Sequence, residues 1–349
     1  MITTSDLIQF ELPDHLACPK PTEERNTSRD DVRLLVTSGE GMSEHAHFSE
    51  IPNYLQPGDV MVVNTSATQP AAFPVSLPGN RQGRLHLSTR INDGEWLVEI
   101  REVVGTGTVR WREGIKGMVL PLPSEAFVKL TAQYYGEREL LHLWVAEFKT
   151  DLEVETYIQQ YGQPIKYEGL DKPYPLDYYQ TFFSIHPGSS EMPSAGRGFT
   201  QAVVDELLSR GVVFAPILLH TGISSLEENE APYPEYMEVD SVTASVINHA
   251  RKNSKRVVAV GTTAVRAVES ATNDQGDVIP QKGQTQLYIE SGHEMKTIDG
   301  LLTGFHEPKA SHLHMLQSLA GFEHIDRAYK AAIEHKYYWH QFGDLHLIL

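Results

Sequence analysis

The residue types most suited to binding a ligand follow a short apolar run in the last third of the chain. Val257–Val260 is continuously apolar, as expected for a strand buried on both faces of a parallel sheet. Gly261 ends this run, and Thr262 or Thr263 can cap the helix that follows. The free backbone N–H groups of such a helix start, two hydroxyls and the guanidinium of Arg266 suit a phosphate or a carboxylate. The same residues also fit a well-capped helix that binds nothing.

Three further loops concentrate glycine, proline and polar residues beside predicted strands and helices. They are Pro193–Thr200, Leu218–Gly222 and Leu301–Ser311. In open parallel sheets, ligands bind at the carboxyl ends of the strands, where the turn at Gly261 and the loop after Leu219 both lie. Several such loops at one edge predict a binding site there.

Histidines near the C-terminus are the candidates for a metal site. His306, His312 and His314 lie close together, but His312 and His314 are two residues apart and would point to different sides of a helix. The sequence has no HExxH or CxxC, no G-x-G-x-x-G after a strand, no P-loop and no G-x-S-x-G elbow. We therefore expect no metal and no cofactor of these classes.

Length and composition are typical of a globular protein with two domains. The chain has 349 residues, of which 40% are hydrophobic and 21% charged. The N-terminal residues lack the apolar core of a signal peptide, and no apolar run approaches the roughly 20 residues that span a bilayer. Cys18 is the only cysteine, which excludes an internal disulfide. We therefore expect a cytoplasmic protein without membrane contacts.

The charge balance argues against binding of nucleic acid over the whole surface. The net charge is −17, whereas such binding needs many Lys and Arg to neutralise phosphates. The segment Arg81–Lys116 differs, since its seven Lys and Arg outnumber its five Asp and Glu (7 − 5 = +2), which leaves −19 for the rest. This segment is a candidate local basic patch.

Predicted strands and helices alternate on both sides of a central segment. In the helix after Gly261, the apolar residues recur at helical spacing, and Arg266 and Glu269 fall on the opposite side. Pro216 interrupts its strand, which suggests an edge position or a bulge. The alternation predicts an α/β fold with a mostly parallel, helix-covered sheet. The predicted strands are Arg33–Ser38, Val60–Asn64, Val212–His220, Val257–Val260 and Gln284–Glu290, and the other predicted helices are Thr200–Arg210, with Thr200 as N-cap, Val242–Lys252, Ser311–Leu319 and Glu323–His335.

The central segment has a different texture. Short β-prone runs separated by Gly, Pro and Asn turns extend from 71 to 148, which is typical of a small barrel or sandwich. Its position within α/β sequence predicts an insertion. We therefore expect an α/β main domain formed by 1–70 and 149–349 and a β-barrel-like domain formed by 71–148.

An ordered series of motifs resembles a known family. The matching pieces include LPDHLA, HFSEIPNYLQPGDVMVVN, DYYQTFF, PSAGRGFT, LLHTG, VVAVGTTAVRAVES, LLTGFHEPKAS and the Gly-Asp of FGDLHLIL, and they cover nearly the whole chain. The sequence resembles the S-adenosylmethionine:tRNA ribosyltransferase-isomerases of queuosine biosynthesis. The resemblance implies an α/β domain with an inserted β-barrel.

The resemblance also implies a reaction and its partners. The family transfers and isomerises the ribosyl part of S-adenosylmethionine onto 7-aminomethyl-7-deazaguanine in tRNA, releasing adenine and methionine and giving epoxyqueuosine. S-adenosylmethionine is a co-substrate and no metal or redox cofactor takes part. Since a sulfonium acidifies the neighbouring 5′-carbon, a general base can start this reaction.

Residues in the matching motifs are the candidate site. His306 and His220 are the candidates for proton transfer, each also fitting a histidine bonded only within the fold. Gly261, Thr262, Thr263 and Arg266 would hold an anionic end of a substrate, and Lys309 would meet negative charge. The remaining expected binding residues are Pro193, Ser194, Ala195 and Gly196, which would shape the nucleoside pocket, and Glu235.

Several loops depart from the family pattern. The family's Asn-Asp-Thr-Arg run reads Asn64–Ala67 here, and a family histidine is replaced by Gly198. Gly-Thr-Phe-Arg-Pro after LLHTG becomes 223–227, and the His-x-Met-His-x-Glu segment retains Glu235 without its histidines. These losses leave two alternatives open: an enzyme on the same scaffold with a different, smaller substrate, or a degenerate binding paralogue. The sequence does not determine the oligomeric state.

Overall fold

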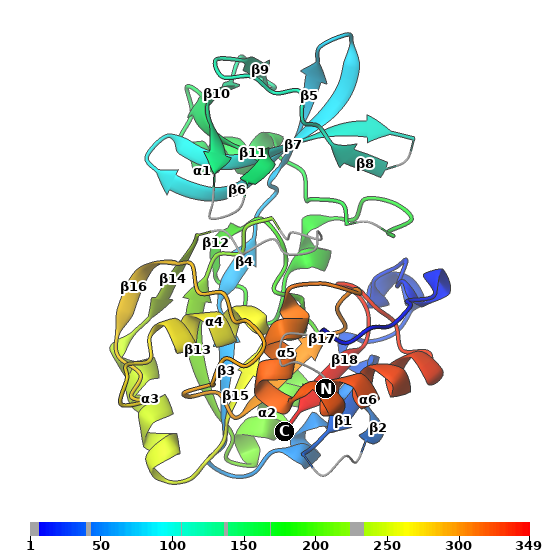
Figure 1. Cartoon of the computed structure of the whole chain (residues 1–349), viewed down its shortest axis with the longest axis vertical. Coiled ribbons are helices and arrows are strands. Elements are labelled where there is room, and N and C mark those ends of the chain that lie inside the picture. Colours follow the sequence, from blue (N-terminus) through cyan, green and yellow to red (C-terminus); the bar gives the residue numbers. More distant parts are fainter. Residues whose placement is uncertain (1–6, 40–42, 106, 136–138, 168, 224–233) are drawn as a thin grey trace.

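A mixed nine-stranded sheet covered by helices and a smaller seven-stranded sheet lie at opposite ends of the long axis of the molecule (Figure 1). The computed structural model describes residues 7–39, 43–105, 107–135, 139–167, 169–223 and 234–349. The chain passes between the two sheets through β4 (Ser66–Thr68) and β12 (His186–Ser189), which pair in parallel.

The nine-stranded sheet corrects the prediction of a mostly parallel sheet, because it is mixed. Four neighbouring strands at its centre, β13, β3, β15 and β17, are parallel, whereas both edges and the β17–β18 pair are antiparallel. Periodicity within a strand does not reveal the direction of its neighbour, so only tertiary pairing decides this point. The strand order is β16 (Gln281–Thr285), β14 (Glu235–Val239), β13 (Val213–Leu219), β3 (Val60–Asn64), β15 (Val257–Val260), β17 (Gly300–Gly304), β18 (Leu345–Ile348), β1 (Arg33–Thr37) and β2 (Ser43–His47).

Helices cover both faces of this sheet. One face packs against α3 (Ser241–Lys252), α4 (Thr262–Ser270), α5 (His312–Ala320) and α6 (Phe322–Glu334). The other face packs against α2 (Gln201–Ser209) and the 3-10 helix η4 (Phe48–Tyr54). Burial on two faces explains the continuous apolar run of β15, all four residues of which are buried.

The helix starts confirm one capping prediction and correct another. Thr200 caps α2 by accepting a hydrogen bond from the backbone N–H of Val203. Neither Thr262 nor Thr263 caps α4, because Gly261 is the N-cap residue, with φ +88°. Glycine adopts this left-handed conformation without the steric penalty of a side chain.

Two strand predictions are also corrected. The strand expected at Gln284–Glu290 lies earlier, as β16, because its pairing with β14 ends at Thr285. Pro216 lies in β13, an interior strand rather than an edge strand. β13 pairs with β3 on one side along Val213–Ile217, but on its other side it pairs with β14 only at Leu218 and Leu219. Proline is tolerated at 216 because no strand pairs with it on that second side.

The seven-stranded sheet has its own apolar core and curls into a nearly closed barrel, with β5 in contact with β9. Helix α1 (Val154–Tyr161) packs on it through Tyr157, whose ring stacks on Phe73 at 5.8 Å. The division into 1–70 with 149–349 and 71–148 stays a prediction. The strands are β5 (Ala72–Leu77), β6 (Arg81–Asn92), β7 (Glu95–Val104), β8 (Gly107–Arg110), β9 (Val119–Pro121), β10 (Phe127–Tyr135) and β11 (Glu139–Lys149).

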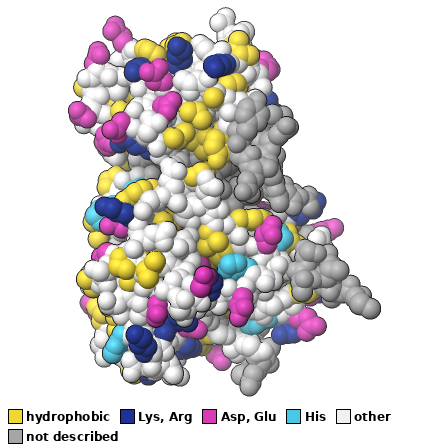
Figure 2. Space-filling model, turned by 60° about the vertical axis from the view of Figure 1, so that its left-hand side comes forward, with side chains coloured by type: hydrophobic (Ala, Val, Ile, Leu, Met, Phe, Trp, Pro, Cys, Tyr) yellow, Lys and Arg dark blue, Asp and Glu magenta, His cyan; other side chains and the backbone are white. Residues whose placement is uncertain are grey.

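The candidate basic patch of this sheet is largely neutralised. Arg81 pairs with Glu102 and Glu113, and Arg101 and Arg110 both pair with the buried Glu99. Figure 2 shows positive and negative side chains interspersed over this end of the molecule. Within the described ranges, no helix is long and apolar enough to cross a membrane.

Candidate active site

A cavity of about 190 Å³ opens where the parallel strands of the mixed sheet end. Residues directly after β13, β15 and β17 line it, so the loops that the sequence singled out meet at one edge. The lining comprises 191–195, 221–223, Glu235, 261–263, Arg266, 287–289, 303–307, 310–312, Met315, His340 and Gln341.

The start of α4 forms one wall of the cavity. The conformation of Gly261 brings Thr262 and Thr263 to the cavity, and Asn64 Nδ2 donates to the Thr263 hydroxyl at 3.3 Å. A Cβ added at Gly261 would lie 3.4 Å from the Cβ of Ala195, so the 193–195 loop approaches the helix start closely. A helix N-terminus here gives the wall a partial positive charge.

Arg266 adds a full positive charge to the same wall. It is only 7% exposed, because its Nη1 pairs with Glu235 Oε2 and its Nε donates to the carbonyl of Leu287 at 3.0 Å. Glu235 Oε1 accepts from the backbone N–H of Gly222 at 2.6 Å. Arg266 Nη2 is buried and has no hydrogen-bond partner within the part of the chain that the structure describes. A buried donor without a partner favours an acceptor on a ligand. Glu269, on the same helix, is also buried and accepts hydrogen bonds from the backbone of 296–298.

Two histidines stack on the floor of the cavity. The rings of His306 and His312 lie 4.5 Å apart and nearly parallel, at 8°. His306 Nε2 lies 3.0 Å from the Thr303 hydroxyl. Burial, with a smaller contribution from His312, lowers the pKa of His306 to about 3, and burial also lowers the pKa of His312. Both rings are therefore neutral near pH 7.

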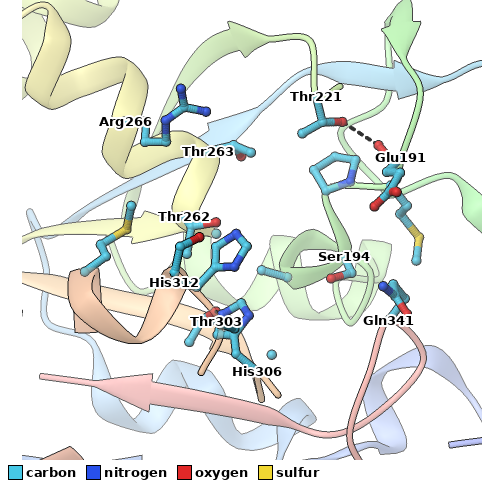
Figure 3. A pocket seen from close by; sticks show the side chains of 18 of the residues that line it. Glu191, Ser194, Thr221, Thr262, Thr263, Arg266, Thr303, His306, His312 and Gln341 are labelled. Carbon is cyan, nitrogen blue, oxygen red and sulfur yellow. Dashed lines mark hydrogen bonds between the residues drawn. The ribbon is translucent and has the colours of Figure 1, made fainter. Parts of the chain in front are cut away.

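The opposite wall comes from the loop before α2 and from the C-terminal segment. Figure 3 shows Ser194, Thr221, Glu191 and Gln341 facing Arg266, Thr263 and the two histidines across the cavity. The Thr221 hydroxyl donates to the carbonyl of Glu191 at 2.5 Å, which ties the loop after β13 to this wall. Cationic, hydroxyl and neutral imidazole groups thus surround a space suited to a polar, partly anionic ligand.

Known proteins match this chain over nearly its whole length, as the motifs do. A family model described as "Queuosine biosynthesis protein" matches residues 5–348. The chain belongs to the queuosine biosynthesis protein family. It is 35% identical to the S-adenosylmethionine:tRNA ribosyltransferase-isomerase of Carboxydothermus hydrogenoformans, over 97% of this chain and 98% of that protein. The corresponding enzyme of Symbiobacterium thermophilum is 33% identical, with the same coverage.

A solved structure is also similar to this member of the queuosine family. The crystal structure of an S-adenosylmethionine tRNA ribosyltransferase from Thermotoga maritima aligns with a TM-score of 0.54 and 26% identity. The alignment covers 99% of this chain and 100% of that one. The mixed sheet and the barrel-like sheet are therefore found together in this family.

Most of the site residues expected from the family motifs lie at the cavity, and three do not. Gly196, His220 and Lys309 are outside the lining. Gly196 is buried in the loop before α2, and Lys309 is exposed beyond β17. The predicted residues at the cavity are Pro193, Ser194, Ala195, Glu235, Gly261, Thr262, Thr263, Arg266 and His306.

His220 belongs to the connection between the two sheets. Its Nδ1 lies 2.8 Å from the hydroxyl of Ser66 on β4, and its ring stacks on Tyr236 at 5.8 Å. A Cβ added at Gly188 would lie 2.5 Å from this ring. Burial lowers the pKa of His220 to about 4. These contacts fit a packing role, the other interpretation that the sequence left open.

The positions that depart from the family pattern are used for packing in this queuosine-family chain. The Thr65 hydroxyl donates to the carbonyl of Ile217 at 2.9 Å. A Cβ added at Gly198 would lie 2.9 Å from the ring of Phe48, so that position has no room for a side chain without a shift of Phe48. The segment 224–227 lies outside the described residues.

Sequence reasoning missed several residues of the cavity, namely Glu191, Glu307, His340 and Gln341, and considered His312 only as a metal ligand. Glu307 follows His306 directly in a motif already singled out, so its position was a usable signal. His340 carried no signal, because only the tertiary fold brings the C-terminal segment to the strand ends. Among the residues that the structure covers, no group of three or more His, Cys, Asp or Glu is arranged to hold a metal ion.

Proposed function

We propose that this protein is an S-adenosylmethionine:tRNA ribosyltransferase-isomerase. It transfers and isomerises the ribosyl part of S-adenosylmethionine onto 7-aminomethyl-7-deazaguanine in tRNA, giving epoxyqueuosine. Membership of the family over 5–348 and the curated relatives named for this activity support the proposal. Since the acceptor is tRNA, the protein would act in the cytoplasm, and the reaction needs no metal or redox cofactor.

The observation that carries this assignment is the buried guanidinium of Arg266 in the cavity lining, whose Nη1 and Nε are bonded and whose Nη2 has no partner among the described residues. Its Nη2 and the N-terminus of α4 offer N–H donors and positive charge to one anionic group. The methionine carboxylate of S-adenosylmethionine is such a group. The ion pair with Glu235 and the hydrogen bond to the carbonyl of Leu287 fix the position of the guanidinium. Glu235 is itself held by the backbone N–H of Gly222.

The rest of the cavity would then receive the nucleoside part. Pro193, Ser194 and Ala195 provide a rigid wall opposite α4. A pKa of about 3 makes His306 a weak base, so we expect it to act as a hydrogen-bond partner of the substrate. Lys309, exposed outside the cavity, would meet the negative charge of tRNA.

Adenine release tests this function. The purified protein is mixed with S-adenosylmethionine and tRNA that carries the aminomethyl precursor, and free adenine is measured over time. We expect adenine release that requires this tRNA and that falls about tenfold in His306→Ala, as for the loss of a hydrogen bond to the substrate. Binding of S-adenosylmethionine without tRNA-dependent adenine release would favour an enzyme with a smaller acceptor, and no adenine above the His306→Ala control would overturn the assignment.

A further inference from the structure

We propose that His340 and Glu307 form the proton-accepting pair of the site, with His340 as the base and Glu307 as the positioning residue. The inference rests on the proposed function, because it assigns a step of that reaction. Glu307 lies in the matching piece LLTGFHEPKAS, whereas His340 lies outside the motifs that carry the family resemblance.

The two side chains are in direct contact. His340 Nδ1 lies 2.5 Å from Glu307 Oε1. Burial would raise the pKa of Glu307, but its hydrogen bond and its attraction to His340 outweigh burial and lower that pKa. Glu307 is therefore ionised and accepts the Nδ1 proton. This bond fixes the tautomer of the imidazole and leaves the lone pair on Nε2.

The backbone holds His340 in an unusual conformation. Its φ is +73°, in the left-handed region, which is costly for a residue with a side chain. The surrounding turn fixes it: Gly343 N donates to the His340 carbonyl at 3.0 Å, and Asp344 N donates to the Tyr338 carbonyl at 2.9 Å. Asp344 in turn accepts from Tyr338 N and pairs with Arg33. Strain maintained by such a network is typical of a residue whose side chain must point to a particular place.

The pair stands where two cavities meet. A second cavity, of about 770 Å³, lies beside the first and is lined by Asp14, His15, Tyr167 and Tyr338 among others. Glu191, Glu307, His340 and Gln341 line both cavities. A reaction between two substrates needs both to reach one point, and these shared residues are the wall that both can touch. We assign the first cavity to S-adenosylmethionine and the second to the acceptor nucleobase.

The two histidines that the sequence predicted for proton transfer are less suited to this step. His306 has a pKa of about 3 and already contacts Thr303, and His220 lies outside both cavities. The position of the missing family histidine is close by, since Gly198 and His340 line one small cavity. His340 thus lines a small cavity together with Gly198, the position at which the family histidine is absent.

The assigned step is a proton transfer. The acceptor nucleobase carries a primary amine that is protonated near pH 7, as alkylamines are. His340 Nε2 takes one proton from this ammonium group: the N–H bond of the amine breaks, its electron pair stays on the amine nitrogen, and an N–H bond forms on the imidazole. The imidazolium is stabilised by the Glu307 carboxylate, and the neutral amine is the nucleophile.

The test compares His340→Ala and Glu307→Gln with wild type in tRNA-dependent adenine release, each with its affinity for S-adenosylmethionine and its melting temperature. His249→Ala and Glu334→Gln, two exposed positions, are the matched controls. We expect kcat to fall about 10²- to 10⁴-fold in His340→Ala and at least tenfold in Glu307→Gln, with the Kd for S-adenosylmethionine within threefold of wild type. Added imidazole should restore part of the activity of His340→Ala only, because free imidazole can take the place of the missing side chain as the base.

The negative results distinguish a failure of the proposed function from a failure of this inference. Wild type without adenine release overturns both the proposed function and this inference. An active wild type with His340→Ala within threefold of it overturns the inference alone. A lowered melting temperature of His340→Ala together with no rescue by imidazole would show a structural role and also overturns the inference.

Discussion

Arg266 on α4 and Glu235 on β14 form an ion pair that leaves one guanidinium nitrogen of Arg266 buried without a hydrogen-bond partner among the described residues. Arginine has five N–H donors in a fixed fork, so one carboxylate does not satisfy it. The pair therefore orients Arg266, a residue of the cavity lining, and leaves its Nη2 without an acceptor among the described residues.

Replacing Arg266 by lysine should weaken substrate binding. Lysine keeps the charge but lacks the fork that reaches both Glu235 and a ligand carboxylate. We expect the Kd for S-adenosylmethionine, measured by calorimetry, to rise about tenfold to a hundredfold, as for loss of a charged hydrogen bond. Arg210→Lys, in a surface pair with Glu206, is the control. A Kd within twofold of wild type for Arg266→Lys would remove Arg266 from the binding site.

Gly261→Ala should affect both stability and binding. Alanine at φ +88° is strained, and its Cβ would lie 3.4 Å from the Cβ of Ala195, so relief of the strain would move the start of α4 against the cavity wall. Gly292 has φ +90° with nothing within 4 Å of an added Cβ, so Gly292→Ala tests the strain alone. We expect both variants to lose about 1 kcal/mol of unfolding free energy in urea titrations, while only Gly261→Ala loses affinity for S-adenosylmethionine. Equal affinities in the two variants would contradict the role of this turn.

Asp59→Asn should destabilise the fold without changing the cavity. Asp59 is buried at the turn before β3, accepts from the backbone N–H of Gln56 at 2.9 Å and pairs with Arg256. Removal of its charge leaves Arg256 with a weaker partner. We expect a loss of about 2–3 kcal/mol in unfolding free energy with an unchanged Kd for S-adenosylmethionine. A change in Kd that the loss of stability does not account for would show that the turn before β3 and the cavity are coupled.

His346 should make stability depend on pH. It is fully buried in β18 with Nε2 2.8 Å from the Thr37 hydroxyl, and burial lowers its pKa to about 3. Below the ordinary histidine pKa near 6.5, the unfolded chain binds a proton that the folded chain does not. Unfolding free energy should therefore fall as pH drops from about 6.5 to about 3. His346→Gln should reduce this slope by up to one proton, whereas the exposed His249→Gln should not change it.

Local pattern was sufficient for much of the fold. The apolar run 257–260 predicts β15 because burial on both faces requires it, and Thr200 predicts the start of α2 because its side chain caps that helix. The texture change after 70 predicts the barrel-like sheet, since short strands and turns are encoded locally. Direction of pairing is not encoded in this way, and the mixed sheet is the consequence.

The site divides along the same line. The sequence by itself determined which loops line the cavity, because glycine, threonine and proline at strand ends have local conformational reasons to be there, as at Gly261. Only the tertiary structure decided that Arg266 is buried against Glu235, that His220 lies away from the cavity, and that His340 contacts Glu307. The partners are 31 positions apart in the Arg266–Glu235 pair and 33 positions apart in the His340–Glu307 pair. The packing of separate elements against one sheet edge sets these relationships.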